Sequence, residues 1–416
     1  MKPTPNRILW IDIAKGFAIF LIVCGHCADK NGVDRILLHF SMFAGVAVFF
    51  FLSGMTFCWK ENSFLCFDRR PFRVFLRGLF RGIIVPYTVW SLISISIYQV
   101  FGATAAGILQ SDRSHFSFIG NLAGMLYGNS GSGYMEWNRP LWFLTCLAVT
   151  ELFWYVFLRI LSNHEEAPAL PYILLAVICL GSAGWFFYSN LHGIQLCLPW
   201  ETETTFCILP FFGLGRFVRA WITGHGDLSD RKQRVKFFFF AASCAAVLWA
   251  LLLGVEDADF RADRFTDPWL FYPEAMLGIS AVISFARLIA FYGDTKFGRI
   301  AVYVGQRTMA ILVMHKFVIM TERVLFSKMG INSLTVWDLS GLNSGHLLAR
   351  EIALDGIRAV IVVVLCLWAE HILAKLCRGC SGKKQVRIDG KELSRSPFSF
   401  IINVTLSDNI RKREEL

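Results

Sequence analysis

The sequence predicts an all-α protein that crosses a membrane about ten times, with both termini in the cytoplasm. The 416 residues are 55% hydrophobic, which is more than a soluble domain needs. Apolar runs of about twenty residues, each long enough to cross a bilayer as a helix, recur along the chain. The Lys and Arg residues gather at alternate ends of these runs, as the positive-inside rule requires.

Ten apolar runs are predicted as spans, and in chain order they are residues 8–28, 36–58, 80–101, 140–160, 170–189, 204–221, 237–254, 269–291, 300–326 and 352–376. The apolar stretch 116–128 is too short to cross and is predicted to be re-entrant or interfacial. The first run is not a signal peptide, because Asp12 and Lys15 interrupt it and no small-residue cleavage site follows. We therefore expect one membrane domain at 1–376 and a basic cytoplasmic tail at 377–416.

The net charge of +10 follows this topology. With the N-terminus inside, the inside segments 59–81 and 216–236 each hold six Lys or Arg residues, and ten more follow Leu373. The outside loop at 255–268 is acidic on balance. Positive charge placed in this way anchors loops on the cytoplasmic face. It therefore predicts an inner (plasma) membrane protein and no nucleic-acid partner.

The first span carries three ionisable residues on one stripe. Lys15 and His26 are eleven residues apart, which places them within roughly 20° around a helix and roughly 16 Å apart along it. Asp12 lies one turn before Lys15 on nearly the same side. Ionisable residues cost about 2.5–3.5 kcal/mol inside a membrane on insertion scales and typically mark a functional site.

His26 and Lys15 could each have a chemical or a structural role. A neutral His26 imidazole can remove a proton from an alcohol or take an acyl group itself, although a histidine hydrogen-bonded between helices is the structural alternative. Lys15 is predicted to bind a phosphate or a thioester carbonyl, to pair with Asp12, or both.

The second and third spans add residues of a different kind. The second ends at Ser53 and Gly54, where glycine allows close backbone approach. Three arginines, Arg73, Arg77 and Arg81, lead into the third span at i, i+4 and i+8. This spacing places their guanidinium groups near one face of a helix. Arginine binds phosphate through two parallel hydrogen bonds, but a positive-inside anchor explains the same residues. Pro86 is predicted to kink this helix and open a cavity.

Later spans hold further polar residues. His315 is a second intramembrane imidazole. Glu151, Asp355 and Arg358 are expected to be inter-helix partners, and we assign them no role in the chemistry. The twelve cysteines are scattered, mostly within apolar runs, so no metal site is predicted.

Taken in order, these motifs resemble the integral-membrane acyltransferase-3 family, which includes polysaccharide and lipopolysaccharide O-acetyltransferases. The family's first helix carries a basic residue, ten further residues and then a histidine, which Lys15 and His26 match, with an aspartate just before, like Asp12. Other family motifs resemble Phe50 to Gly54, Arg73 to Arg81 with Pro86, Leu141-Trp142-Phe143, Phe212 to Gly215, and Gly305, Thr308 and His315. The resemblance covers most of residues 7–330.

The lead-in Trp10 to Gly16 is similar to the fucose 4-O-acetylase-like branch. That branch often has a histidine and a proline before its Phe run, and Ala44 to Ala47 lack them here. The acceptor sugar is therefore not carried over from the branch.

The resemblance implies a membrane O-acyltransferase, most simply one that moves acetyl from acetyl-CoA to a hydroxyl of a cell-surface carbohydrate or its lipid-linked precursor. The expected catalytic residues are His26, Lys15 and Asp12. The expected donor-binding residues are Arg73, Arg77, Arg81, Ser53 and Gly54. The expected substrate-binding residues are Trp142 and His315. The expected partners are the carbohydrate acceptor and membrane lipid, and assembly into a homo-oligomer stays open.

A polytopic transporter or flippase of a sugar-linked substrate is the alternative function. Ten spans with buried charges suit it, but the sequence shows no internal repeat of the kind that builds many transporters. An enzyme of the glycerolipid type would need a His-x4-Asp motif, which is absent at His26. The membrane-bound O-acyltransferase superfamily would rely on a late histidine such as His315, and gives no reason for Lys15 and His26.

Overall fold

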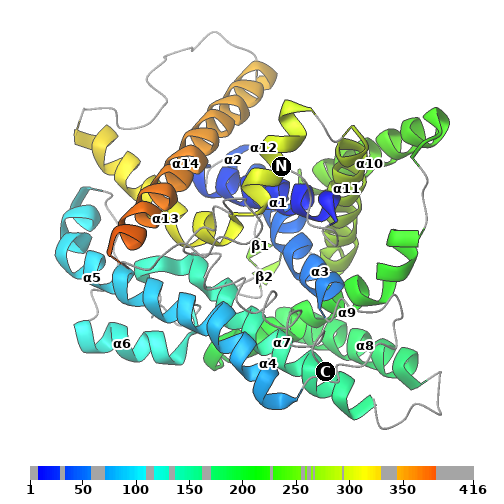
Figure 1. The fold of residues 1–416 in the computed structure, drawn as a ribbon, viewed down its shortest axis with the longest axis horizontal. Coiled ribbons are helices and arrows are strands. Elements are labelled where there is room, and N and C mark those ends of the chain that lie inside the picture. The colour runs from blue at the N-terminus through cyan, green and yellow to red at the C-terminus, as the bar shows by residue number, and fades with distance from the viewer. Residues whose placement is uncertain are drawn as a thin grey trace.

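The computed structural model describes residues 8–28, 33–57, 71–108, 117–130, 136–161, 170–224, 228–253, 258–259, 264–265, 268–292, 295–328 and 344–380. Figure 1 shows the helices α1 (Leu9–Cys27), α2 (Val33–Ser41), α3 (Ala47–Thr56), α4 (Phe72–Leu79), α5 (Val85–Ile108), α6 (Phe118–Tyr127), α7 (Trp142–Leu161), α8 (Leu170–His192), α9 (Thr202–Gly224), α10 (Arg231–Leu252), α11 (Phe271–Phe291), α12 (Lys296–Gly305), α13 (Thr308–Lys328) and α14 (Ser344–Cys380).

Short segments of other kinds connect these helices. A π-helical turn at Met42–Val46 joins α2 to α3, and another at Phe80–Ile84 joins α4 to α5. The strands β1 (Ala258–Asp259) and β2 (Arg264–Phe265) form an antiparallel pair two residues long. All other regular structure in the described residues is helical, as the sequence predicts.

Within the described residues, eight helical segments are long and apolar enough to cross a membrane. The prediction of an all-α, multi-pass membrane protein is therefore confirmed. The predicted spans 204–221 and 300–326 fall on α9 and on α12–α13, which are not among the eight. The count of ten and the cytoplasmic placement of both termini stay predictions. Most of the predicted tail 377–416 lies outside the described residues, although α14 continues to Cys380.

Two details differ from the predicted elements. The run 300–326 is two helices, because Gln306 and Arg307 separate α12 from α13. Arg216 and Arg219 do not lie in a loop, because α9 continues through both and buries them, at 2% and 4% exposure. The buried Arg216 has its partner on a distant segment: its Nη1 donates to the carbonyl oxygen of Phe57 at 2.6 Å, at the end of α3.

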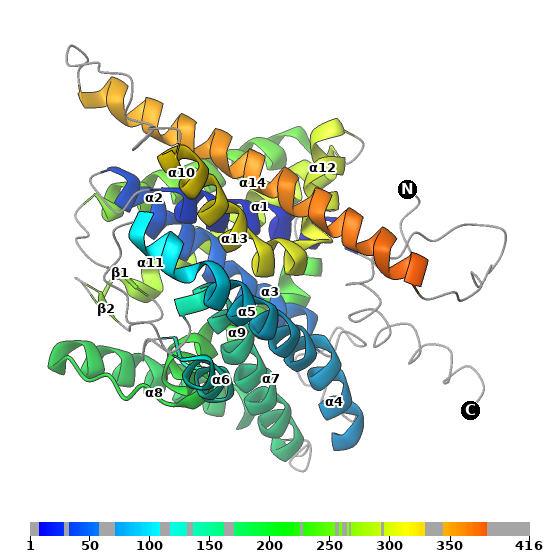
Figure 2. The same cartoon turned by 90° about the vertical axis from the view of Figure 1, so that its left-hand side faces the viewer.

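Helix α1 is the centre of the bundle. It packs against α2, α3, α11, α12, α13 and α14, and Figures 1 and 2 show it enclosed by them. Its apolar residues Ile13, Ala14 and Ala18 are completely buried. On the stripe predicted to carry chemistry, Asp12 is buried and Lys15 and His26 are partly buried.

Candidate active site

The first half of α1 lies at backbone contact distance from α12. A Cβ on Gly305 would overlap the carbonyl oxygen of Asp12, and one on Gly16 would overlap the carbonyl oxygen of Ala301. Only glycine permits such an approach, because any side chain would hold the two backbones apart. This contact fixes the depth and rotation of the turn that carries Asp12 and Lys15.

A polar junction completes this end of the stripe. Asp12 is buried at 6% exposure, and its Oδ2 accepts a hydrogen bond from Gln306 Nε2 at 3.4 Å. The next residue, Arg307, pairs with Glu370 of α14 at 3.3 Å and lies 3.7 Å over the ring of Tyr303. The break between α12 and α13 thus supplies Gln306, which donates to the Asp12 carboxylate.

At the other end of the stripe the structure brings two histidines together. The ring centroids of His26 on α1 and His315 on α13 are 5.1 Å apart, with 32° between the ring planes. His26 is partly buried and His315 is completely buried. The two imidazoles were predicted from separate motifs 289 residues apart in the chain, and here they share one location.

The hydrogen bonding of His315 assigns its tautomer. Its Nδ1 lies 3.0 Å from the carbonyl oxygen of Ile311, which can only accept, so Nδ1 carries the proton. Nε2 then has a free lone pair, and it has no hydrogen-bond partner within the described part of the chain. A buried acceptor without a donor is costly, so this nitrogen is suited to receive a hydrogen bond from a bound hydroxyl.

Sequence reasoning missed Asn138, which holds the backbone beside His315. Its side chain is completely buried, and Nδ2 donates to the carbonyl oxygen of Val313 at 3.1 Å and to Ser94 Oγ at 3.2 Å. It therefore ties α13 to α5 two residues before His315. The available signal was a polar Asn-Arg-Pro sequence directly before the Leu-Trp-Phe motif.

The Leu-Trp-Phe motif packs against the Phe run of α3. The ring of Phe143 lies 4.7 Å from that of Phe50 and 5.8 Å from that of Phe49, while Trp142 contacts Phe143 edge-on at 6.3 Å. Trp142 is partly buried. Two motifs that are distant in the sequence thus form one aromatic cluster.

Ser53 and Gly54, which were predicted to bind the donor, lie where α3 meets α9. A Cβ on Gly54 would overlap the carbonyl oxygen of Phe212, and one on Gly215 would overlap that of Phe51. This reciprocal contact gives Gly54 a packing role. Ser53 is partly buried, and its carbonyl oxygen accepts from the amide of Phe57 at 2.9 Å.

The three predicted phosphate-binding arginines are exposed. Phe75 of α4 stacks on Tyr155 of α7 at 4.1 Å, which leaves Arg73, Arg77 and Arg81 on the uncovered side. α4 packs on α7 and the end of α3, whereas Lys15 lies beside α12, so these two sets of cations belong to different parts of the bundle. The π-helical turn at Phe80–Ile84 directly precedes Pro86, where the sequence predicts a kink.

One of the residues expected to be inter-helix partners, Arg358, has that role. Arg358 of α14 contacts Glu322 of α13 and the carbonyl oxygen of Cys27, and it also contacts Asp355 within its own helix. Glu151 is partly buried on α7. In the described residues no group of three or more His, Cys, Asp or Glu side chains is arranged to hold a metal ion.

Comparison with family models matches residues 8–345 to a family described as an acyltransferase domain. No curated protein and no solved structure matches the chain. The matched region includes both histidines and every predicted site residue. It ends at the start of α14.

Proposed function

Because the chain belongs to the acyltransferase-3 family, as its motifs indicated, we propose that this membrane acyltransferase transfers acetyl from acetyl-CoA to a hydroxyl of a cell-surface carbohydrate or its lipid-linked precursor. The observation that carries the proposal is the His26–His315 pair at one end of the α1 stripe. A partly buried and a completely buried imidazole, the second with an acceptor nitrogen available, suit proton transfer to and from a hydroxyl group.

The chemical step follows from this geometry. His26 removes the hydroxyl proton while the oxygen attacks the thioester carbonyl carbon. The carbon–sulfur bond then breaks, and the proton passes from His26 to the departing thiolate. His315 Nε2 accepts a hydrogen bond from a second hydroxyl of the acceptor and so holds the reacting hydroxyl toward His26. Lys15, about 16 Å from His26 along the helix, is placed to meet the donor and not the acceptor.

Donor binding is assigned to two separate places, Lys15 on the stripe and the arginines of α4. The exposed side chains of Arg73, Arg77 and Arg81 are available to phosphate groups, and the extended pantetheine arm spans the distance from a surface site to a buried thioester. The carbohydrate acceptor is assigned to Trp142 and His315, because a partly buried indole suits a sugar ring and His315 Nε2 can accept a hydrogen bond. Asp12 holds the Lys15 turn through its own contacts.

The test is acetyl transfer from radiolabelled acetyl-CoA into envelope glycans in membranes that hold equal amounts of each protein. His26→Ala is expected to lower transfer by about 10²–10⁴-fold, the usual contribution of a general base. His192→Gln is the matched control, because His192 is exposed at the end of α8. Equal label in wild type and His26→Ala would remove His26 from the chemistry. Absence of label in all samples would contradict acetyl-CoA as donor.

A further inference from the structure

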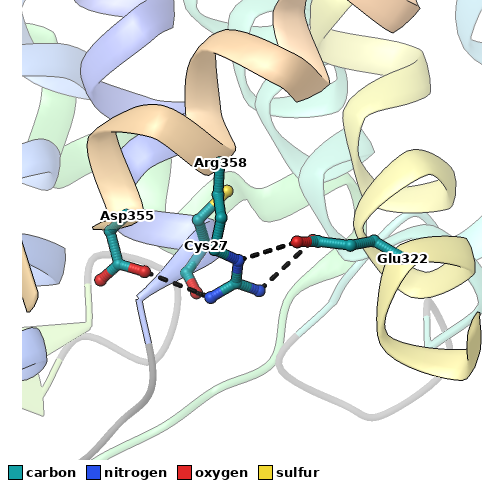
Figure 3. Close-up of polar contacts among 4 residues, drawn as sticks. All are labelled: Cys27, Glu322, Asp355 and Arg358. Atoms are coloured by element: carbon teal, nitrogen blue, oxygen red, sulfur yellow. Dashed lines mark hydrogen bonds and ion pairs between the residues drawn. The ribbon is translucent and has the colours of Figure 1, made fainter. Parts of the chain in front are cut away.

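The last described helix, α14, contacts the His26 end of α1 through the side chain of Arg358. Arg358 of α14 donates from Nη1 to the carbonyl oxygen of Cys27 at 2.8 Å. Its Nε donates to Glu322 Oε1 at 2.9 Å and its Nη2 to Glu322 Oε2 at 3.3 Å. Nη1 also lies 3.2 Å from Asp355 Oδ1. Figure 3 shows the guanidinium between the two carboxylates, over Cys27.

The network is largely removed from solvent. The side chains of Arg358, Glu322 and Asp355 are 12%, 19% and 7% exposed. A guanidinium that meets one carboxylate through two parallel hydrogen bonds has a defined orientation, because the planar fork fits the planar acceptor. Its third contact, to Cys27, satisfies a carbonyl that the end of α1 leaves without an intrahelical donor.

Arg358 contacts the two helices that carry the histidines, α1 and α13. Cys27 directly follows His26 in α1. Glu322 lies seven residues after His315 in α13, which is about two helical turns. One guanidinium is therefore bonded to both helices near the imidazole pair and, through its own backbone, to α14. The family match ends at residue 345, so Arg358 is outside it.

We propose that Arg358 is a positioning residue that sets the separation and orientation of His26 relative to His315. The proposal rests on the proposed acyl transfer only for its catalytic consequence. The guanidinium does not touch the reacting groups. It fixes the last turn of α1 against α13, and a displacement of about 1 Å in a catalytic group can lower a rate by about 10²-fold.

Arg358→Lys is the primary test variant. An ammonium group keeps the charge that Glu322 and Asp355 need, but it cannot reproduce the two-bond fork and the Cys27 contact together. Glu370→Gln is the matched control, because Glu370 also joins α14 to a partly buried arginine, Arg307, at the other end of the stripe. Asp355→Asn is a second control, since it leaves the contacts to Glu322 and Cys27 in place.

Two measurements on purified full-length protein separate positioning from general support. The first is the rate at which diethyl pyrocarbonate modifies His26, followed by peptide mass spectrometry with exposed His192 as internal reference. The second is the steady-state rate with acetyl-CoA and an envelope-glycan acceptor. Arg358→Lys is expected to change the His26 modification rate by severalfold and to lower kcat by about 10–100-fold with little change in the KM for donor. Glu370→Gln and Asp355→Asn are expected to leave the His26 modification rate unchanged.

An unchanged His26 modification rate and kcat in Arg358→Lys would overturn the proposal. Equal changes in Arg358→Lys and Glu370→Gln would also overturn it, because α14 would then act as a general brace. The two proposals can also fail separately. If the His26 modification rate changes only in Arg358→Lys but wild type transfers no acetyl group, the positioning role of Arg358 stands and the proposed donor is wrong.

Discussion

His315 is held more firmly than a histidine that only fills space. Its Nδ1–H is committed to Ile311, and Asn138 secures the backbone two residues earlier. These contacts fix the ring plane, so Nε2 has one direction in which to accept a hydrogen bond. The loss of this acceptor is therefore expected to lower turnover more than it lowers the stability of the fold.

His315→Phe is the variant that tests this. The ring volume is kept and both nitrogens are removed, so folding is expected to persist while acetyl transfer falls by about 10–100-fold, the value of one hydrogen bond in a buried site. His39→Phe is the control, because His39 is also a buried histidine, at 2% exposure, on α2. Transfer per mole of folded protein is the measurement. Equal activity in His315→Phe and wild type would remove the nitrogen from the mechanism.

Residues on one helix were the easiest to predict. The spacing of Asp12, Lys15 and His26 fixes their relative placement once the helix is known, because helical geometry is regular. Asn138 and Arg216 escaped prediction, since each acts through a contact to a backbone carbonyl of a distant segment. Such contacts depend on tertiary structure, and no local period in the sequence indicates them.

At the scale of elements, helix pairs are joined by close glycine contacts. Gly305 lies against Asp12, and Gly54 and Gly215 lie against Phe212 and Phe51. The first contact fixes the helix that carries the predicted catalytic residues, and the second fixes the end of α3. Because van der Waals packing provides much of the association of helices in membranes, these positions are expected to be sensitive to added volume.

Gly305→Ala is expected to lower stability by about 1–3 kcal/mol, because the new methyl group overlaps the carbonyl oxygen of Asp12 and the two helices must separate. Gly184→Ala in α8 is the matched control, since no atom lies within 4 Å of its added Cβ. Its stability is expected to stay equal or to rise by up to about 1 kcal/mol, through improved helix propensity. The thermal unfolding midpoints in detergent provide the comparison. A midpoint for Gly305→Ala at or above that of wild type would contradict the packing account.

Helix positions were predictable because apolar runs of span length are long and distinctive. The break at Gln306–Arg307 was not, because two residues hardly change the average hydropathy of a 27-residue run from 300 to 326. That break has consequences for the site: Gln306 reaches Asp12, and Arg307 reaches Glu370. The break at Gln306–Arg307 therefore contributes contacts to the candidate site, although the hydropathy of the sequence does not indicate it.

At the scale of the whole molecule, α14 packs on two helices, α1 and α13, that lie within the family-matched residues. It lies along α1 and α13, as Figure 2 shows. Arg358 meets α1 beside His26, and Glu370 meets Arg307 beside the residue that bonds Asp12. The two contacts are twelve residues apart on α14, or roughly 18 Å, close to the roughly 16 Å between Lys15 and His26. One helix thus supports both ends of the stripe.

This arrangement also makes a prediction about sidedness. The stripe runs the length of α1, with Asp12 and Lys15 near its start and His26 near its end. If the positive-inside pattern sets the topology, the start of α1 and the exposed arginines of α4 face the cytoplasm. The proposed donor, acetyl-CoA, is charged and does not cross lipid, so with this topology it is expected to meet the enzyme on that face.

Inside-out vesicles are therefore expected to transfer label from added acetyl-CoA, and right-side-out vesicles are expected to transfer none until they are permeabilised. An epitope fused to the C-terminus should be removed by protease in the first preparation and protected in the second, because ten spans return the chain to its starting side. Protease protection of the tag in inside-out vesicles would contradict the even number of spans. Label in sealed right-side-out vesicles would place the donor site at the His26 end of α1. The proposed order, with the donor at the Lys15 end and the acceptor at the His26 end, would then be wrong.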